Sequence, residues 1–146
     1  MNKLTELDKW LILFEDFLEA RGYTEETIKH RIASLKTINE TWGDIVNEDF
    51  ETIYSRMWVK AVRASYRQKQ KQILNYFKFF MNWAQGEGLQ EFANWLRMEG
   101  YSESSIKRYV YSIRQSAERI SRNEKELKMF ETARRTFKRF MRFYFS

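Results

Sequence analysis

Cationic, amide and aromatic side chains recur at helical spacing in the last third of the chain. Arg108, Tyr111, Gln115 and Arg119 follow one another at intervals of three or four residues, which places them on one face of an α-helix. Arginine and glutamine form paired hydrogen bonds with the edges of guanine and adenine, and arginine also pairs with phosphate oxygens. The types and spacing of these residues therefore indicate contact with an anionic partner that has hydrogen-bonding groups.

The basic residues are unevenly distributed along the 146-residue chain. Residues 1–90 carry 13 basic and 13 acidic side chains, whereas residues 91–146 carry 13 and 7, so the net charge of +6 comes from the second part. Even in the first part, the stretch from Arg56 to Lys78 has seven lysines or arginines and no acid. Such blocks are typical of proteins that contact phosphates. The alternative is that they are solvated helix faces that contact nothing.

The sequence offers no residues for catalysis or metal binding. Cysteine is absent and His30 is the single histidine, which excludes disulfides and thiolate sites and argues against a histidine cluster. No pair of carboxylates, phosphate-binding loop, or nucleophile with its base can be assembled. We therefore expect a protein that is not an enzyme and has no cofactor or metal.

The apolar residues follow helical periodicity throughout. The chain has no proline and five glycines, and no window alternates apolar and polar residues over the length of a strand. We predict an all-α fold. The start of the chain lacks an apolar signal-peptide core, and no apolar run reaches the ~20 residues of a membrane span, so we expect a cytoplasmic protein. Helices are expected at residues 7–20, 25–42, within 44–57, and at 59–85, 92–98, 103–120 and 124–143.

The chain contains an internal repeat. The stretch RGYTEETIKHRIASLK at residues 21–36 returns as EGYSESSIKRYVYSIR at residues 99–114, an offset of 78. FKFFM at residues 77–81 returns as FKRFM at residues 137–141, an offset of 60. The second copy is therefore 18 residues shorter than the first, and we expect it to lack the short third helix.

The repeated pattern resembles the N-terminal core-binding domain of tyrosine recombinases and phage integrases. Its parts are an apolar helix, the turn G-Y-[TS]-x-x-[TS]-I-K, and a basic helix that ends in aromatic residues. In that family the domain is a SAM-like bundle of four helices that clamps one face of duplex DNA. The resemblance implies two tandem SAM-like units: the first unit, residues 1–85, and an abbreviated second unit, residues 89–146.

The resemblance implies DNA binding without strand exchange. The family's catalytic domain, with its arginine, lysine, His-x-x-Arg and nucleophilic tyrosine, has no counterpart in this chain. It also implies a mobile element, plasmid or virus as the source, and association with DNA or a nucleoid inside the cell.

We expect the faces opposite the apolar stripes to bind double-stranded DNA, because phosphates and base edges accept hydrogen bonds from cationic and polar side chains. In the helix at 103–120 this outer face includes Ser112, whereas the helix at 124–143 should bury Tyr144 at its end. The predicted DNA-binding residues are Lys29, Lys36, Lys60, Arg67, Lys71, Lys78, Lys107, Arg108, Tyr111, Gln115, Arg119, Lys128, Arg135, Arg139 and Arg142.

Two other binding functions are compatible with the sequence. A protein-interaction module, or an accessory factor of a recombination or replication complex, would use the outer face HRIASLKT at residues 30–37. A single-strand or RNA binder would depend on Tyr111 or Trp83 more than on Arg135, because bases stack on exposed rings. Four aromatic residues outside the core stripes should pack the two units together or form a homodimer or partner contact: Phe79, Trp83, Phe143 and Phe145.

Overall fold

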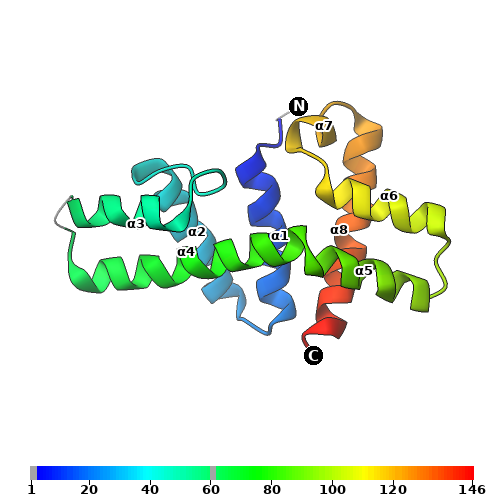
Figure 1. Cartoon of the computed structure of the whole chain (residues 1–146), viewed down its shortest axis with the longest axis horizontal. Helices are drawn as coiled ribbons and strands as arrows, with labels where there is room; N and C mark the ends of the chain where they lie inside the picture. Colours follow the sequence, from blue (N-terminus) through cyan, green and yellow to red (C-terminus); the bar gives the residue numbers. More distant parts are fainter. Residues whose placement is uncertain (1–2, 60–61) are drawn as a thin grey trace.

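The computed structural model describes residues 3–59 and 62–146, and all the regular structure within these residues is α-helical (Figure 1). The all-α prediction is confirmed. The helices are α1 (Glu6–Ala20), α2 (Glu25–Thr41), α3 (Phe50–Val59), α4 (Ala64–Gln85), α5 (Glu87–Met98), α6 (Glu103–Arg114), α7 (Ala117–Ile120) and α8 (Glu124–Tyr144).

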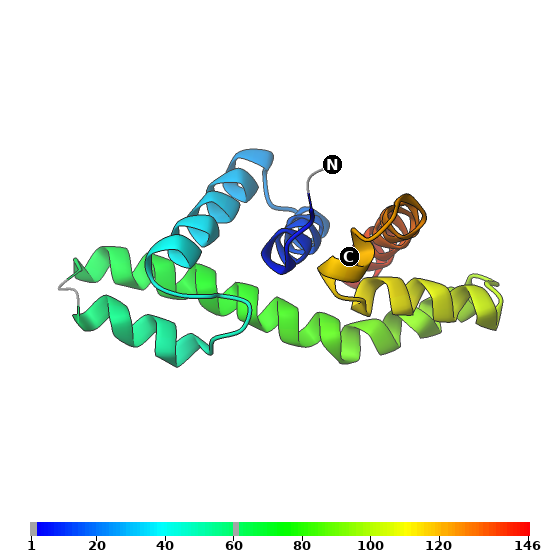
Figure 2. The same cartoon turned by 90° about the horizontal axis from the view of Figure 1, so that it is seen from above.

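The helices α4 and α5 follow one another along the length of the molecule, and the other helices pack on them. Only Gly86 separates the two helices, and it is both the C-cap of α4 and the N-cap of α5. Seen from above, α2, α1 and α8 lie on one side of α4 and α5 (Figure 2). Gly88 is buried in the first turn of α5, where a Cβ atom would lie 2.9 Å from the ring of Trp83. A glycine is therefore needed for α5 to start this close to α4.

The main differences from the predicted bounds lie at the starts of α4 and α5 and at the end of α6. α4 begins at Ala64, not at residue 59, and α5 begins at Glu87, not at residue 92. The helix predicted at 103–120 is interrupted, because Gln115 has extended backbone and Ser116 accepts a hydrogen bond from the backbone N–H of Arg119. A serine that caps a new helix in this way competes with continuation of the old one. The result is a single turn, α7, between α6 and α8.

The repeated turn has the same geometry in both units. Gly22 and Gly100 each have a φ of 89°, a left-handed conformation that glycine adopts readily at the end of a helix. Two residues later, Thr24 and Ser102 cap the next helix. Each hydroxyl accepts a hydrogen bond of 3.2 Å from the backbone N–H three residues further on. The sequence repeat is therefore also a repeat of local structure.

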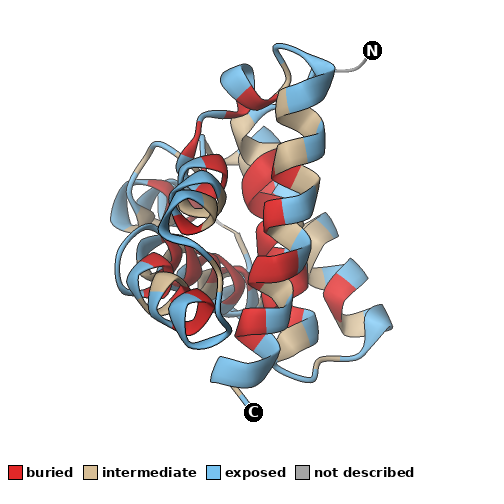
Figure 3. Ribbon diagram, turned by 90° about the vertical axis from the view of Figure 1, so that its right-hand side faces the viewer, coloured by how far each residue is buried: buried red, intermediate tan, exposed pale blue. Residues whose placement is uncertain are grey.

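The buried side chains of both units form one hydrophobic core. Figure 3 shows that buried positions gather on the inward sides of the helices and exposed positions on their outer sides. At the centre, the ring of Trp83 lies 6.2 Å from that of Phe137, and the ring of Phe17 lies 5.2 Å from that of Phe145. Trp83 of the first unit and Phe145 of the second thus each contact the other unit, as predicted.

Polar contacts also join α1 to the second unit. The buried ammonium group of Lys9 donates a hydrogen bond of 2.6 Å to the carbonyl of Gln115. Asp16, also buried, accepts a 2.9 Å hydrogen bond from the guanidinium group of Arg134 in α8. Charged groups at this depth need such partners, so these contacts specify how α1 lies against the second unit.

Candidate nucleic-acid interface

A basic groove of about 490 Å³ lies between α6 and α8 in the second unit. Its cations are Arg108 from α6 and Lys125 and Lys128 from α8, and Tyr111 contributes an aromatic ring. Among the described residues that line the groove, Glu126 is the only acid. The excess of cations favours an anionic ligand. Lys125 was missed in the sequence, although its position three residues before Lys128 puts both on one helical face.

The α6 side of the basic groove presents an exposed tyrosine. Tyr111 is solvent-exposed, and its hydroxyl accepts a hydrogen bond of 3.2 Å from the guanidinium group of Arg119. Arg108 and Lys107 are exposed on the same helix. This hydrogen bond orients the tyrosine and one of the arginines predicted to contact DNA.

The prediction that Ser112 and Gln115 face outward is wrong. Ser112 is 1% exposed because α8 packs against its side of α6, and its hydroxyl has no hydrogen-bond partner among the described residues. Gln115 is 9% exposed. Because α6 ends before Gln115, this residue turns inward, where its carbonyl accepts the hydrogen bond from Lys9. Gln115 is therefore not available to read a base edge.

The exposed face of α8 extends the positive surface beyond the basic groove. Lys128, Arg135 and Arg139 are all exposed, and their spacing of seven and four residues places them on one stripe. The guanidinium group of Arg139 lies 5.5 Å above the ring of Trp95. Such stacking holds the side chain while its N–H groups stay free for phosphate.

A second row of cations on α8 faces α1 and is engaged there. Arg134 and Lys138 both approach the carboxylate of Asp16, at 2.9 and 3.7 Å. Burial raises the pKa of Asp16, and the two cations oppose this shift. Arg142, predicted to contact DNA, pairs with Glu19 at 2.9 Å, and Lys138 pairs with it at 2.7 Å. These hydrogen bonds lower the pKa of Glu19, so this row stabilises the packing of α1 against α8.

Arg67 and Lys71, which were predicted to form a basic ridge on α4, contact α3 instead. The guanidinium group of Arg67 lies 3.7 Å above the ring of Trp58 and also donates a hydrogen bond to a backbone carbonyl. The ammonium group of Lys71 lies 5.1 Å above the ring of Tyr54. Both side chains are half-buried, so the prediction that they are free on an outer face is wrong.

The remaining predicted cations of the first unit are scattered. Lys78 is half-buried, and its ammonium group donates a hydrogen bond of 3.3 Å to the carbonyl of Val46. Burial lowers the pKa of Lys78. Lys29 pairs with Glu25 at 3.4 Å, and Lys36 is exposed. The predicted residue Lys60 lies outside the described residues. These predicted cations of the first unit therefore do not meet in one groove.

Tyr144, which was predicted to be buried, is exposed. It lies in the last turn of α8, where its ring packs near Trp83 and Phe140 with centroid distances of 5.6 and 5.4 Å.

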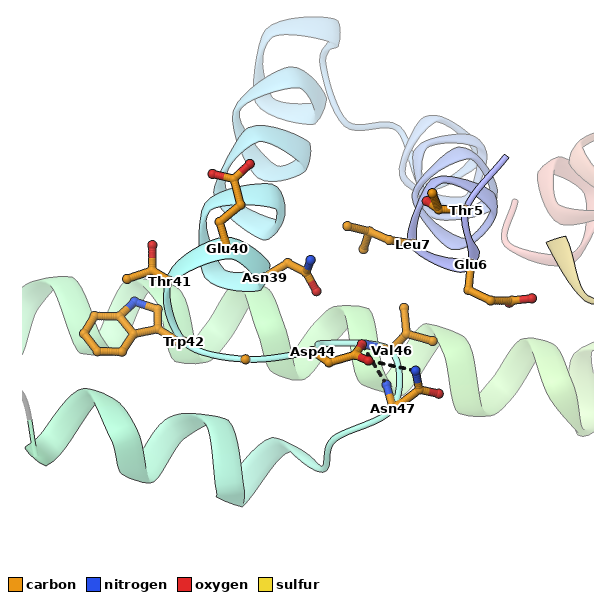
Figure 4. A pocket seen from close by; sticks show the side chains of 11 residues that line it. Thr5, Glu6, Leu7, Asn39, Glu40, Thr41, Trp42, Asp44, Val46 and Asn47 are labelled. Carbon is orange, nitrogen blue, oxygen red and sulfur yellow. Dashed lines mark hydrogen bonds between the residues drawn. The ribbon is translucent and has the colours of Figure 1, made fainter. Parts of the chain in front are cut away.

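A hollow of about 740 Å³ between the start of α1 and the loop after α2 has the opposite character (Figure 4). Its charged lining residues are Glu6, Glu40 and Asp44. The carboxylate of Asp44 already accepts hydrogen bonds from the backbone N–H of Val46 and from the side chain of Asn47. Within the described part of the chain, no three histidine or acidic side chains are grouped closely enough to hold a metal ion. This hollow does not suit a phosphate.

None of the helices in residues 3–59 and 62–146 combines the length and the apolar character of a membrane span. Comparison with known proteins found no match for this chain among family models, curated proteins or solved structures.

Proposed function

We propose that the protein binds duplex DNA, without catalysing a reaction, through the surface that α6 and α8 form in the second unit. The observation that carries the proposal is the meeting of Arg108, Lys125 and Lys128 across the basic groove. The stripe on α8 continues this surface through Arg135 and Arg139. A row of cations of this kind suits the regularly spaced phosphates of a duplex.

The two sides of the basic groove have different roles in this proposal. Lys125, Lys128 and Arg135 bind phosphates, which fixes position and contributes most of the affinity. Arg108 on α6 is exposed beside Tyr111, and its guanidinium group can reach either a phosphate or a base edge. We therefore assign any preference for a particular base sequence to α6.

The first unit has an auxiliary role in the clamp. Its exposed Lys36 and the partly paired Lys29 provide a weaker footprint on α2. Because both units belong to one chain, contact by the second unit raises the effective concentration of the first at the same duplex. We therefore propose that the repeat places two units of unequal affinity on one chain, so that both can hold the same duplex.

The proposal is tested by fluorescence anisotropy with a labelled duplex of random sequence and about 30 base pairs, titrated at two salt concentrations. The test variant changes Arg108, Lys128 and Arg135 together to Glu. We expect the wild type to bind in the micromolar range or tighter and to weaken steeply with salt, since about 0.9 of a counterion is released per neutralised phosphate. In the variant, binding should fall by at least about a hundredfold, because three favourable contacts become repulsive.

The matched control changes Lys3, Arg63 and Lys69 together to Glu. These side chains are exposed and none of them lines the basic groove. The control has the same net charge as the test variant, because each changes three cations to glutamate. An equal loss in both variants would show that only the total charge matters. An absence of duplex binding by the wild type at low salt would refute the proposal and favour a protein partner.

A further inference from the structure

The first unit contains a groove that the duplex-binding proposal does not use. This groove, here called the aromatic groove, has a volume of about 610 Å³, which is within the usual range of small-molecule sites. It lies between the end of α1, α2, α4 and the last residues of the chain. The residues that line it are Phe17, Arg21, Tyr23, Arg31, Gln72, Asn75, Tyr76, Phe79 and Phe145.

One wall of the aromatic groove is a pair of rings on successive turns of α4. The rings of Tyr76 and Phe79 are inclined by only 8°, with their centroids 6.3 Å apart. Phe79 is 57% exposed, so its ring is accessible to a ligand. An exposed ring beside a partly buried one provides a flat surface on which a planar ligand can stack.

The charges in the aromatic groove all have one sign. Arg31 lies with its guanidinium group 4.7 Å above the ring of Tyr23, and Arg21 lies 5.2 Å above the ring of Phe145. No acid is among the described residues that line the groove, and neither arginine forms an ion pair within the described part of the chain. Two stacked arginines without acidic partners favour an anionic group, above all a phosphate.

The rim of the aromatic groove has side-chain amides. Gln72 and Asn75 are exposed on α4, on the same side as Phe79. Each amide can donate and accept hydrogen bonds at once, as the edge of a nucleobase requires. A flat ring surface, two cations and two amides at one site match the base, the phosphate and the base edge of a nucleotide.

We propose that the aromatic groove binds an unpaired nucleobase together with its phosphate, as presented by single-stranded nucleic acid. The base stacks on Phe79 and Tyr76, and Arg21 and Arg31 bind the phosphate. Because bases within a duplex are stacked and paired, they cannot enter such a groove without leaving the helix. The site is thus distinct from the α6–α8 surface and adds a second ligand to the proposed function.

The test compares two labelled strands of about ten nucleotides by fluorescence anisotropy at moderate salt. One strand is oligothymidine, and the other has the same phosphates and sugars but no bases. We expect the wild type to bind oligothymidine at least about tenfold more tightly, because stacking of each base contributes substantially to single-strand affinity. Phe79→Ala should lose most of this preference, whereas Phe79→Trp should keep it.

The matched control is Phe143→Ala. Phe143 is 59% exposed, about as much as Phe79, and does not line the aromatic groove. Arg31→Gln should weaken binding of both strands, because it removes a phosphate contact. Far-ultraviolet circular dichroism and thermal unfolding of each variant show whether the fold is intact.

The outcomes separate this proposal from the duplex-binding proposal. Equal affinity of the wild type for the two strands, or equal losses in Phe79→Ala and Phe143→Ala, would overturn the nucleobase site. Neither result would affect duplex binding, which depends on Arg108, Lys128 and Arg135. Conversely, a triple glutamate variant that loses the duplex but retains the preference for oligothymidine would support two distinct sites.

Discussion

The two units share a turn but differ in the surface that follows it. With the sequence offsets of 78 and 60, Ala33 and Asn75 of the first unit correspond to Tyr111 and Arg135 of the second. Phe79 corresponds to Arg139 in the same way. At two of these three positions the second unit has an arginine where the first is uncharged, and at the third it has an aromatic ring where the first has an alanine. The glycines and caps that build the turn are the same, so the fold does not require this difference in surface.

The cations of the two units also differ in their contacts. On α4, Arg67 and Lys71 stack on rings of α3 and support that helix. The second unit has the single turn α7 in place of α3, and the positions of α8 that match Arg67 and Lys71 hold Leu127 and Glu131, which are not cations. Its cations at Lys128 and Arg135 remain exposed. They match Gln68 and Asn75 of the first unit, so the exposed cations of α8 are not counterparts of those that support α3.

The largest effect on stability is expected from a substitution of Asp16, which joins α1 to α8. In Asp16→Ala, Arg134 and Lys138 lose their shared buried partner. Arg134 and Lys138 keep Glu131 and Glu19 as partners, so we expect the free energy of unfolding to fall by about 3 kcal/mol, the low end of the loss for breaking a buried ion pair. Urea denaturation followed by circular dichroism measures this change.

The control for Asp16 is Glu131→Ala. Glu131 pairs with the same arginine, Arg134, at 3.1 Å, but it is more exposed than Asp16. Its loss should cost less than about 1 kcal/mol. Similar losses in the two variants would mean that the contact between α1 and α8 does not depend on the buried carboxylate.

A smaller effect is expected from the buried Lys9, which joins α1 to Gln115. Burial lowers the pKa of Lys9 from 10.5 to about 8. Because the folded protein binds this proton less tightly than the unfolded chain does, the cost of burying the charge is present below pH 8. It disappears as the pH rises from about 8 to 10.5. We expect the wild type to gain about 2 kcal/mol relative to Lys9→Met between pH 7.5 and pH 10.

Urea denaturation of both proteins at several pH values tests this expectation. Every other titratable group is present in both the wild type and Lys9→Met. The difference between the two curves therefore reports Lys9 alone. Parallel curves would show that the ammonium group of Lys9 reaches water in the folded state.

Local signals predicted much of the fold. The caps at Thr24 and Ser102 and the turns at Gly22 and Gly100 were predictable, because each depends on residues within one helical turn. The break at Gln115 was missed because the apolar spacing continues from α6 into α7. The capping serine that follows Gln115 was the signal for it.

Tertiary contacts limited the prediction of the site. The sequence shows that Arg67 and Lys71 lie on one face of α4, but not that α3 brings Trp58 and Tyr54 against that face. The same limit hid the aromatic groove, because Arg31 and Phe79 meet only when α2 packs near α4. Helical periodicity identifies a face, whereas its neighbours depend on the whole fold.

The smallest expected effect tests whether the two turns are equivalent. Gly22 and Gly100 have the same φ of 89°, and a Cβ atom added at either position would meet nothing within 4 Å. The cost of Gly22→Ala and Gly100→Ala is therefore conformational alone. We expect about 1 kcal/mol for each variant, measured by urea denaturation. A single transition in both variants, with equal losses, would mean that both turns unfold cooperatively. Two transitions, of which each substitution shifts only one, would mean that the units open separately, so that the buried contacts of Lys9 and Asp16 do not couple the two units.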